Sequence, residues 1–201
     1  SFENKVYDRA LASYQQVIKN SQSKKQVQEA HLRSVQIYRL QGELDKATDS
    51  IKNMLLDEAY KTIFGSLELE LVKLYDQQKM HTEAINRLES ISQDYPRSKT
   101  SAEAYFILGN YSISQEWDLE TALKYFGMVS KEFNKSLLVK PALLRLKEIN
   151  SYNNLIEQYD LYTIKISEVD SSGAPLFTNK DLNDFATIIY GLAELESFHF
   201  S

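Results

Sequence analysis

The 201-residue sequence contains no cysteine. Without thiols the chain can form neither disulfides nor cysteine-based zinc sites, and it cannot use a cysteine nucleophile. The absence of cysteine does not identify the cellular compartment, because a cysteine-free chain is compatible with both the cytosol and an oxidising periplasm. Long apolar runs are also missing, and a membrane-spanning helix would need about 18 consecutive apolar residues. We therefore expect no direct membrane insertion of this chain.

Glycine and proline are scarce, with 6 and 3 copies respectively. Folds rich in β-structure use both residues freely in turns, so their scarcity favours long helices with short connections. Leu, Ala, Glu, Lys and Gln are abundant, and all five are good helix formers. The composition therefore predicts an all-α protein.

A basic face is absent as well. The formal net charge is -5, and residues of both signs are interspersed along the chain. Binding to nucleic acid normally requires clustered basic residues. We expect no nucleic-acid partner, and we interpret the mixed charges as solvated helix surface.

Signatures of catalytic and metal chemistry are missing too. The three histidines, His31, His81 and His199, lie far apart in the sequence, whereas metal sites on helices need ligands at spacings such as i and i+4. No glycine-rich phosphate loop, nucleophile elbow or Ser/His/Asp arrangement is visible. We expect no catalytic residues, no cofactor, no metal site and no enzymatic activity.

Four segments share one pattern, an alanine followed by large apolar side chains four and seven residues later. The alanines are Ala10, Ala47, Ala84 and Ala122, at spacings of 37, 37 and 38 residues. Offsets of 0, 4 and 7 lie on one face of an α-helix, so each segment is predicted to be a helix with one buried stripe. The small side chain would let a neighbouring helix approach closely at that point.

A second apolar-periodic segment precedes each of the later alanines. Tyr38 and Tyr75 stand nine residues before Ala47 and Ala84, and the links at 41–43 and 78–79 are short. Short links make consecutive helices antiparallel neighbours. Each unit is therefore predicted to be a helix–turn–helix of about 37 residues.

These units resemble the tetratricopeptide repeat family. That family places a Leu-Gly pair in the first helix (helix A), an alanine and a large apolar residue in the second (helix B), and a proline at the end of the unit. Leu108, Gly109, Ala122 and Phe126 match this pattern, and Pro96 closes the preceding unit. The resemblance implies an α-α superhelix, a right-handed solenoid of antiparallel pairs with about ten helices.

A narrower resemblance involves the stretch from Asp94 to Gly109. It is similar to envelope-associated repeat proteins of Gram-negative bacteria, which include outer-membrane assembly lipoproteins and periplasmic cell-division coordinators. This resemblance implies a periplasmic or cell-envelope location, while the composition alone is equally compatible with the cytoplasm.

The later part of the chain departs from the repeat. We expect a single repeat domain over 1–201, with clear repeats at about 7–135, a degenerate unit at 136–169, a loop at 170–178 and a further helix at 179–200. Large residues occupy the next alanine position, near Tyr159 or Leu155, which predicts a splayed pair or one longer, bent helix there. Both ends of the chain carry apolar helices without polar caps, from which we expect a fragment of a longer array.

In the family that the chain resembles, the A helices line a concave groove and contact the ligand. The matching positions are spaced by three or four residues, so each set forms one stripe along a helix. The resemblance thus assigns nine partner-binding residues: Leu32, Gln36, Arg39, Leu69, Lys73, Asp76, Phe106, Asn110 and Ile113.

The expected function is a non-enzymatic scaffold that binds a peptide or a partner protein in this groove. The alternative is a structural module that packs in cis within a larger envelope protein. A third possibility, an enzyme with its site between the repeats and another domain, has no support within these residues. The sequence does not identify the partner or the oligomeric state.

Overall fold

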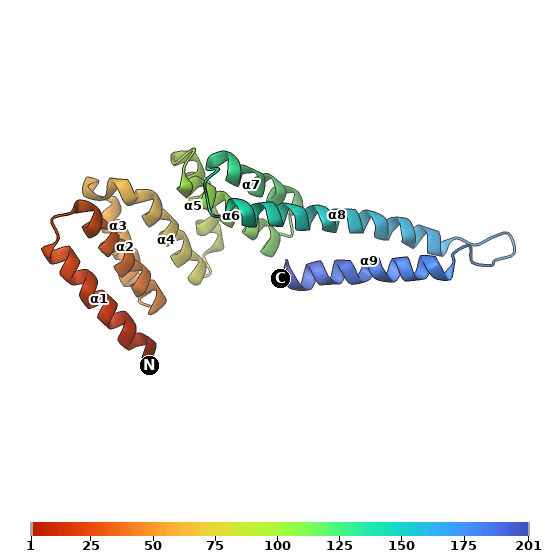
Figure 1. Ribbon diagram of the computed structural model, residues 1–201, viewed down its shortest axis with the longest axis horizontal. Coiled ribbons are helices and arrows are strands. Elements are labelled where there is room, and N and C mark those ends of the chain that lie inside the picture. Colours follow the sequence, from red (N-terminus) through yellow and green to blue (C-terminus); the bar gives the residue numbers. More distant parts are fainter. Residues whose placement is uncertain (1, 201) are drawn as a thin grey trace. The chain divides into compact units, whose positions relative to one another are not determined.

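The computed structural model describes residues 2–200, and over this range it contains nine α-helices, one 3-10 helix and no β-strand (Figure 1). The prediction of an all-α helical-repeat fold is confirmed. The elements are α1 (Phe2–Asn20), α2 (Lys24–Leu40), α3 (Leu44–Leu55), η1 (Glu58–Ile63), α4 (Phe64–Gln77), α5 (His81–Asp94), α6 (Lys99–Ser114), α7 (Leu119–Glu132), α8 (Val139–Ser167) and α9 (Asn179–Phe198).

The chain forms two compact units, one ending at Ala104 and the other beginning at Tyr105. The division falls within α6, so this helix contributes its first turns to one unit and the remainder to the other. In the first unit α1 packs on α2, α2 on α3, α3 on α4 and α4 on α5. In the second unit α8 packs on both α7 and α9.

The alanine positions lie at the centre of the helix packing. Ala47, Ala84 and Ala122 are fully buried, whereas Ala10 on α1 is half-buried. Ala47 belongs to an apolar cluster of the first unit, together with buried residues of α2, α3 and α4 that include Val35, Ile51, Leu67, Leu71 and Leu74. The repeating alanine thus marks the place where each B helix meets its neighbours.

Gly109 has a comparable role in the second unit. A Cβ atom at this position would lie 2.7 Å from the ring of Phe126 on α7, closer than side chains pack. The Leu-Gly pair therefore lets α7 bring an aromatic ring directly against the backbone of α6. The ring of Phe106, one turn earlier on α6, meets Phe126 edge-on at 5.6 Å.

The links between paired helices repeat one backbone conformation. Gly42, Lys79 and Trp117 all have positive φ angles, of 79°, 59° and 52°. Each lies five residues before a buried alanine, so the turn recurs in phase with the repeat. In the first two links the amides of Glu43 and Met80 donate to the carbonyls of Tyr38 and Tyr75, both at 2.9 Å, which closes the end of helix A.

The degenerate unit forms a single helix, α8, which runs for 29 residues from Val139 to Ser167. The prediction left open a splayed pair or one longer, bent helix, and the structure has a single continuous helix here. No glycine or proline occurs between Ala142 and Ser167, so nothing in the sequence interrupts the helix. Pro141 lies in the first turn, where its missing N–H has no partner to lose.

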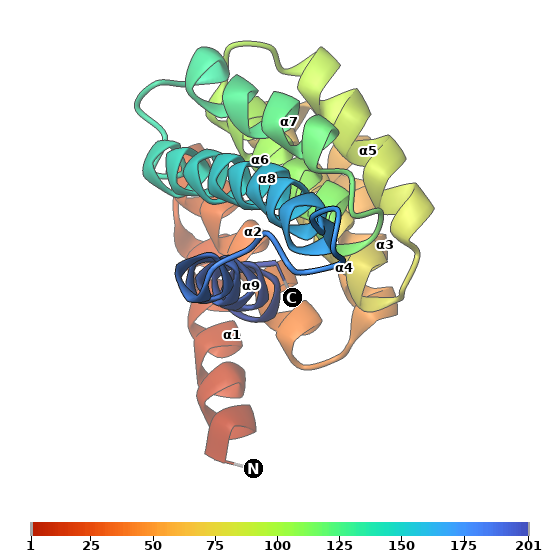
Figure 2. The ribbon, with the colours of Figure 1, turned by 90° about the vertical axis from the view of Figure 1, so that its right-hand side faces the viewer.

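Helix α9 runs back alongside α8 after the loop (Figure 1, Figure 2). It begins with a capping box, in which the Thr178 side chain accepts from the Asp181 amide and the Asp181 carboxylate accepts from the Thr178 amide. The loop between α8 and α9 spans residues 168–178. Along the hairpin the ring of Phe185 lies against Tyr159 and Tyr162.

Candidate functional site

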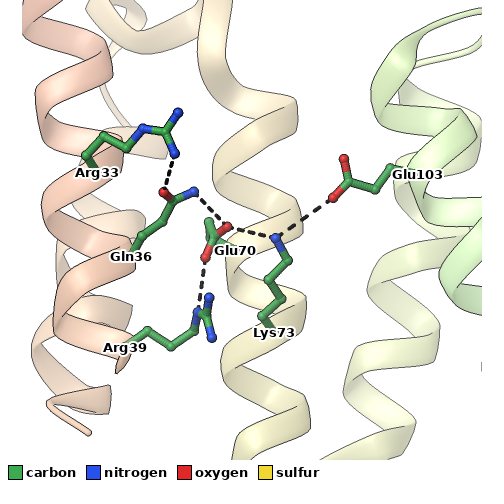
Figure 3. Close-up of polar contacts among 6 residues, drawn as sticks. All are labelled: Arg33, Gln36, Arg39, Glu70, Lys73 and Glu103. Atoms are coloured by element: carbon green, nitrogen blue, oxygen red, sulfur yellow. Dashed lines mark hydrogen bonds and ion pairs between the residues drawn. The ribbon is translucent and has the colours of Figure 1, made fainter. Parts of the chain in front are cut away.

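Glu70 is a buried carboxylate at the contact between α2 and α4 (Figure 3). Its side chain is only 3% exposed, and it interacts with three donors from two helices. Gln36 donates to Oε1 at 3.0 Å, Lys73 donates to the same oxygen at 2.9 Å, and the Arg39 Nε donates to Oε2 at 3.1 Å. Both carboxylate oxygens are therefore engaged, as a buried charge requires.

The surroundings of Glu70 keep it ionised. Burial acts to raise the pKa of Glu70, but the hydrogen bond and charge of Lys73, the charge of Arg39 and the hydrogen bond from Gln36 outweigh it. The pKa of Glu70 consequently lies below its ordinary value. A general acid at neutral pH needs the opposite shift. The Glu70 site is thus suited to holding cations in place rather than to proton transfer.

The contacts extend on both sides of Glu70 across three helices. Lys73 Nζ also lies 3.8 Å from the Glu103 carboxylate on α6. On α2 the Arg33 guanidinium donates to the Gln36 side chain at 3.0 Å. We call these six side chains the polar network: Arg33, Gln36, Arg39, Glu70, Lys73 and Glu103.

The outer members of the polar network reach solvent. The side chain of Arg33 is 51% exposed and that of Lys73 is 37% exposed, whereas Arg39 is 18% exposed. The network therefore combines a fixed interior carboxylate with cationic groups that remain accessible from outside. Side chains held in this way lose little further rotamer freedom when a ligand binds.

Three of the predicted partner-binding residues, Gln36, Arg39 and Lys73, come together in the polar network. Leu32 and Leu69 also lie on the first unit's A helices, but both are buried, at 8% and 5% exposure. Leu32 packs into the apolar cluster around Ala47. Leu32 lies one turn before Gln36 on the same side of α2, so its burial comes from the neighbouring side chains that cover this part of the helix. Because both leucines are buried, we leave them out of the proposed surface.

The other four predicted residues lie elsewhere. Asp76 is exposed at the end of α4, 3.6 Å from the His81 imidazole. Phe106, Asn110 and Ile113 belong to the second unit. Phe106 packs on Phe126, and the Asn110 side chain donates to the backbone carbonyl of Phe106 at 2.9 Å. Ile113 is buried at 4% exposure, so it too is left out of the proposed surface.

Sequence reasoning missed Arg33, Glu70 and Glu103 as members of a site. The spacing of Glu70 and Lys73 by three residues predicts a local pair on one helix. What the sequence does not show is that Glu70 points at α2, since that depends on the crossing of two helices distant in sequence. The 34-residue separation of Gln36 and Glu70, close to the repeat period, is the one available signal.

The second unit has a separate polar and aromatic cluster where the end of α9 meets α8. The buried carboxylate of Glu148 accepts from Arg145 at 3.2 Å and lies 2.8 Å from His199 Nδ1. Arg145 also donates to the backbone carbonyl of His199. These contacts tie the C-terminal end of α9 to α8.

Aromatic contacts reinforce this junction. Trp117, Tyr152 and Phe200 meet one another edge-on, with ring centroids 5.5 to 6.0 Å apart. Burial and a hydrogen bond from the Tyr152 hydroxyl to Glu196 raise the pKa of Tyr152 to about 12, so it remains a neutral donor. Trp117 thus packs within the second unit although it remains 47% exposed. We interpret the junction as structural.

Within residues 2–200, no group of three histidine or acidic side chains is arranged to hold a metal ion. Over the same described range, no helix is both long enough and apolar enough to cross a bilayer. Neither known protein families nor curated proteins yield a match to this sequence.

Proposed function

We propose that the chain is a non-enzymatic scaffold of the tetratricopeptide type, which binds a peptide segment or a partner protein over the polar network. The observation that carries the proposal is a buried carboxylate held by Arg39 and Lys73, with Lys73 and the neighbouring Arg33 accessible from solvent. These residues come from helices related by the repeat, so they form a continuous strip across α2 and α4 (Figure 3).

The network favours a partner segment of mixed charge. Its cations alternate with the carboxylates of Glu29, Glu70 and Glu103, so the strip carries both signs in close succession. A partner carboxylate can bind at the exposed side of Arg33 or Lys73 and accept a charge-assisted hydrogen bond there, which is stronger than a hydrogen bond between neutral groups. A partner cation can bind beside Glu103. Extended and helical segments both present side chains at spacings that suit such a strip.

Protein binding accounts for the network better than catalysis does. The carboxylate of Glu70 is fully engaged and has a lowered pKa. The network includes neither a hydroxyl nucleophile nor an imidazole base. Rigid, oppositely charged side chains give specificity to a protein contact.

Site-specific photo-cross-linking tests the proposal. A benzophenone amino acid placed at position 33, within the network, should form adducts with the partner in extracts of cells that make the protein. Position 52 on α3 is the matched control, since Lys52 is also an exposed helical cation but lies outside the network. The adduct at position 33 should disappear when Arg39→Gln and Lys73→Gln are introduced together.

The cross-linking results distinguish a strip that binds the partner from one that does not. A discrete adduct that depends on Arg39 and Lys73 supports the proposal. Equal adducts at positions 33 and 52, or an adduct at 33 that survives the double substitution, would show that this strip does not bind the partner. Circular dichroism of the double variant confirms that its helices remain folded.

A second candidate, a structural module that packs in cis within a larger protein, is favoured by one feature of α9. Besides the stripe that faces α8, this helix has an exposed apolar stripe formed by Leu182, Ala186, Ile189 and Ala193. Their spacing of four, three and four residues puts them on one face. A photo-cross-linker at Ile189 that reacts only with another part of the same polypeptide would support this candidate, and one that reacts only with other proteins would contradict it.

The proposal also includes a periplasmic or cell-envelope location, which is supported by the likeness of the stretch from Asp94 to Gly109 to envelope proteins. Cell fractionation, carried out on cells that naturally produce the protein, tests this location. Recovery with cytoplasmic proteins alone would contradict the location and leave the binding proposal intact.

A further inference from the structure

A cavity of about 450 Å³ lies between α1, α2, α3 and η1 in the first unit. Its walls include His31 and Tyr38 from α2, Asn53 and Met54 from α3, and Asp57 and Tyr60 at η1. Binding pockets for small groups begin at about 300 Å³. This cavity is therefore large enough to admit a whole side chain of another polypeptide.

The wall formed by η1 is fixed in position. The Gln28 side chain on α2 donates to the backbone carbonyl of Ala59 at 2.6 Å and accepts from Thr62 at 2.9 Å. The Asp57 carboxylate accepts from the Ala59 amide at 2.8 Å. The ring of Tyr60 meets His31 edge-on at 5.4 Å. The aromatic side of the cavity is consequently preorganised rather than assembled on binding.

The charge in the cavity is negative. None of the described side chains that line it belongs to Lys or Arg. Burial lowers the pKa of His31, so its imidazole is neutral at neutral pH. Burial and the charge of Asp57 raise the pKa of Tyr60, so its hydroxyl stays protonated. Asp57 is then the one charged group among the described residues of the wall, which otherwise consists of aromatic, apolar and neutral polar side chains.

One ring of the cavity already binds a cation within the chain. Lys46 Nζ lies 3.9 Å from the centroid of the Tyr38 ring, and it also pairs with Glu43 at 2.8 Å. Lys46 is not itself a wall residue. The Tyr38 ring thus has the electron-rich face that attracts cations, and Glu43 balances the charge of the neighbouring Lys46.

We propose that this cavity binds a cationic side chain of a partner polypeptide, an arginine in particular. A guanidinium is planar, so it can lie against an aromatic face while its edge donates to the Asp57 carboxylate and to the side-chain oxygen of Asn53. Its aliphatic stem meets Met54.

The site is independent of the polar network. His31, Ser34, Val35 and Tyr38 form one stripe of α2, at spacings of three, one and three residues. Arg33, Gln36 and Arg39 form another, displaced by roughly half a turn of the helix. The two surfaces can therefore be tested separately, and failure of either leaves the other standing.

The direct test compares two capped tripeptides by NMR titration of the whole chain. The probe is acetyl-Gly-Arg-Gly-amide, and the control replaces arginine with citrulline, whose urea group has the same shape without the charge. The arginine peptide should bind roughly three- to tenfold more tightly, the range expected for cation–π and exposed ion-pair contacts. Amide shifts should be confined to residues 15–18, 28–38 and 50–62, which line or adjoin the cavity.

Two substitutions identify the groups responsible. Asp57→Asn removes the charge but keeps an acceptor for the Ala59 amide, and should weaken arginine binding to the level of citrulline. The control is Asp49→Asn on α3, which makes the same change of charge at an exposed position outside the cavity. It should leave arginine binding unchanged. Tyr60→Leu removes the ring while retaining apolar volume, and should also weaken binding.

Four outcomes would overturn the proposal. The first two are the absence of any saturable shift with the arginine peptide and equal affinity for the two peptides. The others are shifts located outside the cavity and equal losses from Asp57→Asn and Asp49→Asn. Thermal unfolding of each variant, monitored in parallel, distinguishes lost binding from lost structure.

Discussion

Glu70 is the residue whose ionisation should matter most to the stability of the first unit. Because its pKa is lowered on folding, it stabilises the folded state above its unfolded pKa of about 4.3, and this contribution disappears as the pH falls through the folded pKa. We expect Glu70→Gln to lower the free energy of unfolding by about 1–2 kcal/mol at pH 7. Urea unfolding measures the difference, which should close progressively below about pH 4.

The matched control is Glu103→Gln. Glu103 belongs to the same network, but its side chain is 30% exposed and its distance to Lys73 is 3.8 Å. Such a pair contributes little, so the change should stay within about 0.5 kcal/mol. Equal losses from the two substitutions would show that burial of Glu70 is not what makes it important.

Gly109 tests the contact between α6 and α7. An added methyl group would lie 2.7 Å from the Phe126 ring, so the ring or the helix must shift. We expect Gly109→Ala to destabilise the protein by about 1–3 kcal/mol, the usual penalty for overpacking. Gly127→Ala, on α7 with nothing within 4 Å of the new methyl, should instead stabilise it by up to about 1 kcal/mol. Thermal unfolding of the two variants should shift in opposite directions.

Single residues differ in how far the sequence reveals their role. Gly109 could be singled out beforehand as part of the Leu-Gly pair that carries the family resemblance, whereas the close approach of Phe126 is visible only in the structure. Glu70 could not, because a glutamate on a predicted helix is far more often solvated than buried. Its burial depends on the angle at which α2 crosses α4, and no local sequence pattern specifies that angle.

At the scale of elements, the link between α4 and α5 contains a strained residue. Lys79 has a φ of 59°, the same left-handed conformation that Gly42 adopts one repeat earlier. A side chain makes that conformation unfavourable by roughly 1 kcal/mol, and glycine removes the penalty. We expect Lys79→Gly to raise the free energy of unfolding by up to about 1 kcal/mol. Chemical denaturation at pH 7 measures the effect.

The control for this substitution is Lys79→Ala, which removes the same charge but keeps the Cβ atom. It should produce no gain. If alanine and glycine stabilised the protein equally, the loss of the lysine charge would explain the change and backbone strain would not.

The elements themselves were predictable to the extent that their signals are local. The period of the alanines predicted α3, α5 and α7, and Thr178 with Asp181 predicted the start of α9. The path of α8 was left open, because the absence of a breaker permits a long helix without requiring one. What decides it is packing: Tyr159, at the position where a small residue would otherwise recur, lies against Phe185 of α9.

At the scale of the whole molecule, the alanines predicted the repeat but not the two compact units. The periodicity indicates that each helix pair resembles the next, but it does not indicate where one compact unit ends and the other begins. The boundary between Ala104 and Tyr105 falls inside a helix whose sequence shows no break. The division has a measurable consequence, since each unit should respond to damage in its own core.

Enlarging the buried alanines tests that consequence. Ala47 lies in the first unit and Ala122 in the second, and both are fully buried. We expect Ala47→Leu and Ala122→Leu each to cost about 1–3 kcal/mol through overpacking, whereas Ala193→Leu on the exposed face of α9 should change stability by less than about 0.5 kcal/mol. Equilibrium unfolding measures the costs.

Amide hydrogen exchange then locates them. Ala47→Leu should reduce protection in α2, α3 and α4, and Ala122→Leu should reduce it in α7 and the part of α8 that packs on α7, with additive effects in the double variant. Loss of protection throughout the chain from either substitution alone would show that the two units unfold as one. In that case the whole chain, rather than the compact unit, would be the cooperative unit of this fold.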